Sequence, residues 1–123
     1  MCLLGSLLIY SSKEGHLLHT IPKVHSRHGI SFIEAMDDLE FCTGGRDGKL
    51  KTFSFNSSND KDAPNMSTCQ NLKLSWLERL VDIGDGNRCI LGFHSSSFVV
   101  HSIVDAVNVS EVVCGGEFIF ITV

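Results

Sequence analysis

The sequence predicts an all-β fold built from repeated antiparallel sheets. Its apolar segments are short, rich in Val, Ile, Phe and Leu, and bounded by Gly, Asp, Asn or Ser, which is typical of strands. Segment 49–55, KLKTFSF, alternates polar and apolar residues with the period of two expected of a half-buried strand. A pattern of small or turn-forming residues before a ring also recurs in three stretches, which end at Tyr10, Phe53 and His101, about 45 residues apart.

A repeat of about 40–45 residues with four strands per unit is typical of the blades of a WD-type β-propeller. We therefore predict an incomplete WD-type β-propeller of about two and a half blades, each a four-stranded antiparallel sheet. Because such sheets bury their faces against their neighbours, we expect each to be stabilised by the adjoining one. A small free-standing β-sandwich is the alternative fold.

The repeat also predicts how the chain is divided. The outer strands of a first blade occupy residues 1–24, a second blade occupies 25–75 with a polar loop at 56–65, a third blade occupies 76–114, and 115–123 is an atypical tail.

Nine segments are predicted to be strands, and tight turns separate several of them. The segments are 5–10, 15–21, 29–36, 39–45, 49–55, 79–85, 88–94, 96–103 and 109–115. Turns are expected at Asp37-Asp38, Asp47-Gly48 and 85–87, since Asp, Asn and Gly tolerate tight-turn backbone. The apolar residues of 71–83, NLKLSWLERLVDI, also fit a helical period, so a helical turn is an alternative there.

The second blade contains four residues that we expect to form a structural network. His25 precedes the innermost strand, Thr43 ends the next, Asp47 makes the tight turn, and Phe53 closes the third strand. A buried turn carboxylate must be paired, because an unpaired buried charge is very costly. Blades of this type usually carry an indole where Phe53 stands, so one donor is lost and the network has at most three hydrogen-bonding members.

The glycine-rich segment 42–53, CTGGRDGKLKTF, is not a nucleotide-binding loop. Three residues separate Gly44 from Gly48-Lys49, where a P-loop needs four, and Leu50 stands where the loop needs Ser or Thr. The segment leads into a strand, whereas a phosphate loop opens a helix. We interpret it as a structural turn.

No metal site, cofactor or catalytic residue is predicted. His25 and His28 share a loop, but no Cys or carboxylate is expected to converge on them. Cys42 and Cys89 lie in predicted strands with no base assigned to either. The chain has five cysteines without a C-x-x-C pair, which indicates reduced thiols, as expected in the cytosol or nucleus. The start, MCLLGSLLIY, lacks the features of a signal peptide.

Four blocks of the sequence resemble the later repeats of the family of WD repeat-containing protein six. They match it in order and spacing, and are VHSRHGISFIEAMDDLEFCTGGRDGKLKTF, WLERLVDI, CILGFHSSSFVVHSI and VVCGG. The resemblance runs from residue 3 to about 116. It departs at His101, where the family usually has Trp, and in the final EFIFITV. Ser95 at the turn of the third blade is a further weak position.

The resemblance implies a non-catalytic scaffold in the cytoplasm. Its partner would be an FtsJ-type tRNA ribose methyltransferase, which would hold S-adenosylmethionine and methylate the wobble nucleotide of the anticodon loop. The scaffold would position tRNA and hold the enzyme. A WD-repeat adaptor for protein–protein interaction, without an RNA role, is the alternative.

A local cluster of cations is the one feature that favours contact with RNA. The net charge of −4 argues against general nucleic-acid affinity. Lys23, Arg27, Arg46 and Lys49, however, fall in two kinds of loop that open on the same face of a propeller. We predict that this basic rim contacts tRNA phosphates or the partner protein. An ordinary solvated rim is the alternative.

Overall fold

The computed structural model describes residues 5–27, 29–56, 63–84, 87–115 and 118–122. At Arg27 and from Cys114 onward it describes the backbone but not the side chains. These residues form strands and turns but no helix, and so none that is long and apolar enough to cross a membrane. The strands are β1 (Leu7–Tyr10), β2 (Leu17–Ile21), β3 (Val24–Arg27), β4 (Ile30–Asp37), β5 (Glu40–Gly45), β6 (Lys49–Ser54), β7 (Asn65–Asn71), β8 (Trp76–Gly84), β9 (Asn87–His94), β10 (Ser97–Ser102), β11 (Val107–Gly115) and β12 (Phe118–Thr122).

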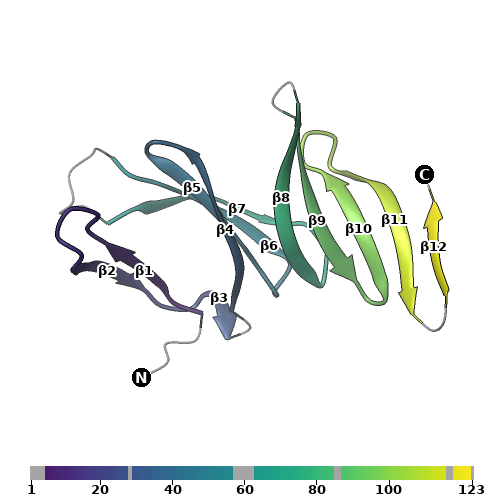
Figure 1. The fold of residues 1–123 in the computed structure, drawn as a ribbon, viewed down its shortest axis with the longest axis horizontal. Coiled ribbons are helices and arrows are strands. Elements are labelled where there is room, and N and C mark those ends of the chain that lie inside the picture. Colours follow the sequence, from purple (N-terminus) through teal and green to yellow (C-terminus); the bar gives the residue numbers. More distant parts are fainter. Residues whose placement is uncertain (1–4, 28, 57–62, 85–86, 116–117, 123) are drawn as a thin grey trace.

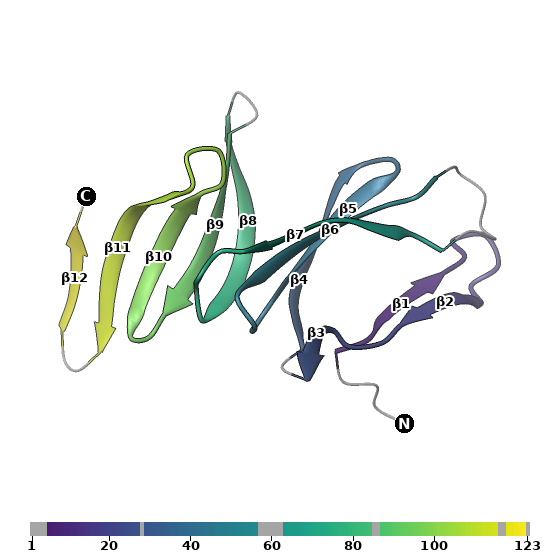
Figure 2. The same cartoon turned by 180° about the vertical axis from the view of Figure 1, so that it is seen from behind.

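Three antiparallel sheets follow one another along the chain (Figure 1). Sheet 1 contains β1 and β2, sheet 2 has the order β4-β5-β6-β7, and sheet 3 has the order β8-β9-β10-β11-β12. Every strand in sheets 2 and 3 pairs with its neighbour in sequence, and the view from behind shows the same succession (Figure 2). This series of meandering sheets is a partial WD-type β-propeller.

Sheet 3 has one strand more than the four predicted for a blade. The run that the sequence sets apart as an atypical tail supplies β12, which pairs with β11 from Gly115↔Phe118 to Glu111↔Thr122. The backbone of this run therefore continues the sheet. Its side chains lie outside the described residues.

The helical alternative for residues 71–83 is wrong, because a β-bulge accounts for the helix-like spacing. Leu77 and Leu80, three residues apart, are both buried in β8. In a regular strand they would point to opposite faces. The register of β8 on β9 shifts between Leu77 and Arg79, so Leu77 lies opposite Gly92 and Leu80 opposite Ile90. The extra residue brings both leucines to the face that packs on sheet 2.

Strand β7 is the element that the sequence patterning does not reveal. It forms the outer edge of sheet 2, and all its residues, Asn65 to Asn71, are exposed. A strand that is solvated on both faces lacks the alternation of polar and apolar residues from which strands are predicted. The predicted polar loop ends where this strand begins, and residues 57–62 of that loop lie outside the described residues. Of the turn expected at 85–87, residues 85–86 also lie outside them.

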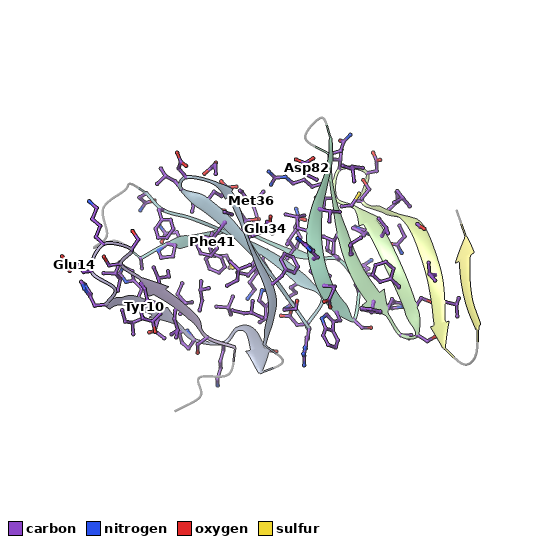
Figure 3. The ribbon with its side chains drawn as sticks, viewed as in Figure 1. Tyr10, Glu14, Glu34, Met36, Phe41 and Asp82 are labelled. Atoms are coloured by element: carbon purple, nitrogen blue, oxygen red, sulfur yellow. The ribbon has the colours of Figure 1, made fainter. Side chains whose placement is uncertain are left out.

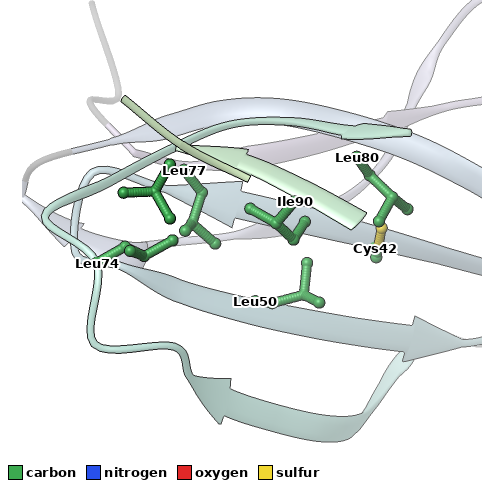
Figure 4. Close-up of a cluster of buried hydrophobic side chains, with 7 residues drawn as sticks. Cys42, Leu50, Leu74, Leu77, Leu80 and Ile90 are labelled. Atoms are coloured by element: carbon green, nitrogen blue, oxygen red, sulfur yellow. The ribbon is translucent and has the colours of Figure 1, made fainter. Parts of the chain in front are cut away.

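Sheet 2 packs against a neighbour on each face, because successive residues of its inner strands belong to different clusters. Cys42 and Leu50 belong to a buried cluster with residues of sheet 3, of which Figure 4 labels six. That cluster consists of Cys42, Leu50, Leu74, Leu77, Leu80, Ile90 and Val99. Phe53 belongs instead to a cluster on the side of sheet 1, in which Phe41 stacks on it at 5.3 Å between ring centroids.

The faces that point away from these two clusters are less covered. On sheet 1, Leu7 is buried against sheet 2, whereas Leu8 and Tyr10 are exposed (Figure 3 labels Tyr10). Sheet 2 therefore holds the central place, since each of its neighbours buries one face on it.

Replacing Ile90 with Ala is expected to lower the free energy of unfolding by about 2–5 kcal/mol, because it leaves a cavity between sheets 2 and 3. Ile90 is fully buried, whereas Ile83 is 66% exposed, so Ile83→Ala is the matched control and should cost little. Urea unfolding followed by the fluorescence of the single tryptophan measures both. Equal losses in the two variants would contradict the core as described.

Candidate functional site

The network predicted around His25 has three members in the structure. The His25 side chain is fully buried, with Nδ1 at 2.9 Å from Asp47 Oδ1 and Nε2 at 2.7 Å from Thr43 Oγ1. Strand β3 carries His25 onto β5, where a Cβ added to Gly45 would lie 2.3 Å from the imidazole ring. Gly45 is therefore required by the close approach of the histidine.

The pKa of His25 and its two hydrogen bonds determine the protonation state and the tautomer of the ring. Burial lowers this pKa below its ordinary value of 6.5, and the hydrogen bond and charge of Asp47 oppose the shift without cancelling it. The ring is therefore neutral at pH 7. Since the carboxylate of Asp47 only accepts, Nδ1–H donates to Asp47, and Nε2 accepts the hydroxyl proton of Thr43.

Phe53 does not join this network. Its ring is buried in the apolar cluster with Leu7 and Val24, between sheets 1 and 2. Lys51, which shares the face of Phe53 two residues earlier, donates from Nζ to the carbonyl oxygen of Val24. Lys51 thus ties β6 to the segment that carries His25, a role that its sequence position did not reveal.

Three amides at the Asp47-Gly48 turn already donate hydrogen bonds within the chain. The N–H of Arg46 donates to the Gly29 carbonyl, that of Gly48 to the Gly45 carbonyl, and that of Lys49 to Asp47 Oδ1. Gly48 has a φ of 75°, and a Cβ there would lie 1.8 Å from the Leu74 carbonyl oxygen. The turn is therefore packed against the segment that links sheets 2 and 3, in keeping with a structural role.

The predicted basic rim is partly assembled at this end of sheet 2. Arg46 is exposed and Lys49 half-buried, on either side of the turn. Lys23 is exposed in the segment that brings His25 to Asp47, so that segment meets the turn. The side chain of Arg27 lies outside the described residues.

A contact between Arg46 and Trp76 is the main feature that the sequence does not reveal. The guanidinium carbon of Arg46 lies 4.1 Å from the ring centroid of Trp76, the first residue of sheet 3. Trp76 also meets Phe93 edge-on, at 6.3 Å between centroids. Its Nε1 is buried and has no hydrogen-bond partner among the described residues. This cation–π contact joins the rim of sheet 2 to sheet 3.

Sheet 3 does not repeat the histidine–aspartate contact. His101 is buried at the ring position, and its Nδ1 lies 2.8 Å from Asn108 Oδ1 on the neighbouring strand. At the turn, Ser95 uses its backbone N–H, which lies 3.3 Å from Ser75 Oγ. The polar pairing of this sheet is therefore a different one, centred on β10 and β11.

The buried thiol of Cys42 is held in its protonated form. Cys42, Cys69 and Cys89 are free cysteines. Burial raises the pKa of the Cys42 thiol to about 11, and the nearby charge of Glu34 adds to the effect, so Cys42 is protonated at pH 7. Within the described ranges, His, Cys, Asp and Glu side chains form no group of three or more that converges on one point.

The sheet series and its strand order are those of a partial WD-type β-propeller. The chain is similar to three proteins named "tRNA (34-2'-O)-methyltransferase regulator WDR6", with 29% identity over 97 residues to that of Pongo abelii, 26% over 99 to that of Bos taurus, and 28% over 97 to that of Homo sapiens. The matches cover 79–80% of this chain but 8% of each relative, so the chain spans a small part of their length. No protein-family profile and no solved structure matches it.

Replacing Thr43 with Val is expected to lower the free energy of unfolding by about 1–3 kcal/mol, because Nε2 of the buried His25 loses its donor. Thr20 is exposed on β2, so its hydroxyl is hydrated and no buried group depends on it. Thr20→Val, which makes the same chemical change, is therefore the control. Chemical unfolding at pH 7.5 measures the difference. Equal stability of the Thr43 variant and the unmodified chain would contradict the network.

The contribution of His25 to stability is expected to fall as the pH falls below 6.5. The folded chain holds the pKa of His25 below this ordinary value, so between the two values the unfolded state binds a proton that the folded state does not. The contribution is therefore complete above 6.5 and is lost as the pH falls through the lower, folded pKa. His25→Gln, which keeps a donor and an acceptor but does not titrate, is the reference.

Unfolding free energies of the two chains, measured between about pH 7.5 and 5, isolate this effect from the other histidines. The advantage of the unmodified chain over His25→Gln should shrink toward pH 5. A constant advantage would show that folding leaves the pKa of His25 unshifted, and a growing one that folding raises it, and either would contradict the buried neutral ring.

Proposed function

We propose that the chain is part of a non-catalytic WD-repeat scaffold that supports 2′-O-methylation of the tRNA wobble nucleotide by a partner methyltransferase. The observation that carries the proposal is the similarity, over most of the chain, to proteins named as regulators of a tRNA (34-2'-O)-methyltransferase. The repeated sheets support it, because propellers present loops on a rigid frame and suit assembly.

The chemistry of the described residues supports a role without catalysis. Both ring nitrogens of His25 are occupied by Asp47 and Thr43, so this imidazole has no nitrogen left to act as a base. The thiol of Cys42 is buried and protonated. The partner, an FtsJ-type enzyme in the proposal, would bind S-adenosylmethionine and supply the reacting groups.

The basic rim is the proposed place of contact with tRNA or with the partner. Its members are Lys23, Arg27, Arg46 and Lys49. Arg46 is the strongest of them, because its stacking on Trp76 orients the planar guanidinium while the residue stays exposed. The edge of a stacked guanidinium can donate two parallel hydrogen bonds to a phosphate.

A WD-repeat adaptor without an RNA role is the second candidate. The net charge of −4 favours it, because nucleic-acid affinity rests mainly on phosphate neutralisation. In both cases we propose that the protein works in the cytoplasm.

Affinity purification of the protein from its own cells is expected to recover a 2′-O-methyltransferase together with tRNA. Loss of the protein should lower methylation of the ribose at tRNA position 34, measured by mass spectrometry of digested tRNA. Normal methylation without the protein would contradict the scaffold role and favour the adaptor.

Arg46→Glu is expected to weaken tRNA binding about tenfold near 0.1 M salt, and to reduce the slope of log affinity against log salt by about one. Arg79 is exposed on β8 and is not one of the four rim residues, so Arg79→Glu is the matched control. Filter binding across a salt series measures both. Equal weakening by the two variants would show that net charge, and not the rim, governs binding.

A further inference from the structure

A groove between sheets 2 and 3 remains outside the proposed function. Two hollows of about 360 Å³ and 570 Å³ lie there, and Gln70 and Ile103 line both of them. The hollows are therefore adjacent. We call them together the inter-sheet groove.

The two halves of the inter-sheet groove differ in chemistry. Met36, Leu50 and Leu80 give the smaller half an apolar lining, with Arg88 as its cation. In the larger half, Lys73 and His94 join the side-chain amides of Gln70, Asn71 and Asn108. Neither lining includes an Asp or a Glu. The charge of the groove thus complements an anion that carries an apolar neighbour.

His101 belongs to the larger half of the groove. Its Nδ1 lies 2.8 Å from Asn108 Oδ1, and both residues line this half. Because a carboxamide oxygen only accepts hydrogen bonds, Nδ1–H of His101 is the donor to Asn108. The other ring nitrogen, Nε2, takes no part in this contact. The repeat before it ends in the apolar ring of Phe53, whereas this one places a polar ring beside the groove.

Two strained residues border the same half. Lys73 has a φ of 60° and Ala106 a φ of 56°, values that residues other than glycine adopt at a cost. Strain of this kind concentrates at binding sites, where the surrounding structure holds it in place.

Strand β7 adds a backbone element. It is the last strand of sheet 2, so its outer edge is unpaired among the described strands, and its residues Gln70 and Asn71 line the groove. An extended peptide can pair with such an edge, with alternate side chains entering the groove beside it.

We propose that the inter-sheet groove binds an extended segment of a protein partner, with an Asp or Glu side chain near Lys73 and an aliphatic side chain in the apolar half. The linings set this direction, because Met36, Leu50 and Leu80 give one half an apolar wall, whereas Lys73 lies in the half with the polar wall.

Nucleic acid suits the inter-sheet groove less well than a peptide. Neither lining contains Phe, Tyr or Trp, so bases have no ring to stack on. A nucleic-acid backbone also carries a charge at every nucleotide, which the apolar half cannot match. This binding role is separate from tRNA methylation and does not depend on it.

Selection of a random heptapeptide display library on the immobilised full chain tests the proposal. The unmodified chain should enrich peptides with Asp or Glu close to an aliphatic residue. Lys73→Glu should replace that acidic preference with Lys or Arg, and should weaken the originally enriched peptides at least tenfold in fluorescence polarisation. Lys13→Glu, an exposed change between β1 and β2, is the matched control and should select as the unmodified chain does.

Trp76 fluorescence and circular dichroism establish that each variant is folded. Three results would overturn the proposal: no enrichment above an empty surface, the same acidic preference with Lys73→Glu, or displacement of the enriched peptides by an oligouridylate RNA. The last would assign the groove to nucleic acid. Because no tRNA or methyltransferase is used, a failure here leaves the scaffold role to its own test.

Discussion

The contact between sheets 2 and 3, centred on the fully buried Leu77 and Ile90, is the interaction on which the rest of the structure depends. A four-stranded sheet alone has no core, so it must bury a face against another sheet. Sheet 2 does so on both sides, toward Ile90 on one and toward Leu7 on the other. The turns, the basic rim and the inter-sheet groove keep their positions because the packing of the sheets holds them.

Polar contacts fix the alignment of neighbouring sheets, which apolar packing alone does not determine. A buried apolar face tolerates small slides, whereas hydrogen bonds to one buried ring do not. His25 joins the segment after sheet 1 to β5 and its turn, and Arg46 joins that turn to Trp76 of sheet 3. These contacts tie the loops at this end to sheets 2 and 3, as the proposed contacts with tRNA or a partner enzyme require.

The sequence predicts those parts of the structure whose cause is local. The alternation in 49–55 predicts β6, and the spacing of His25, Thr43 and Asp47 predicts residues that the structure brings together. It misses β7, whose exposed residues have no alternation, and it leaves β8 ambiguous because a bulge imitates a helical period. The inter-sheet groove could not be predicted from such sequence patterns, because it forms only when two sheets pack together.

Native-state hydrogen exchange at increasing denaturant tests the dependence of the sheets on each other most directly. If their shared core holds them together, the slowest amides of β5 and β6 in sheet 2 and of β9 and β10 in sheet 3 should exchange through one opening, with the same free energy. Exchange of sheet 3 through its own opening at lower free energy, while sheet 2 stays protected, would contradict the account.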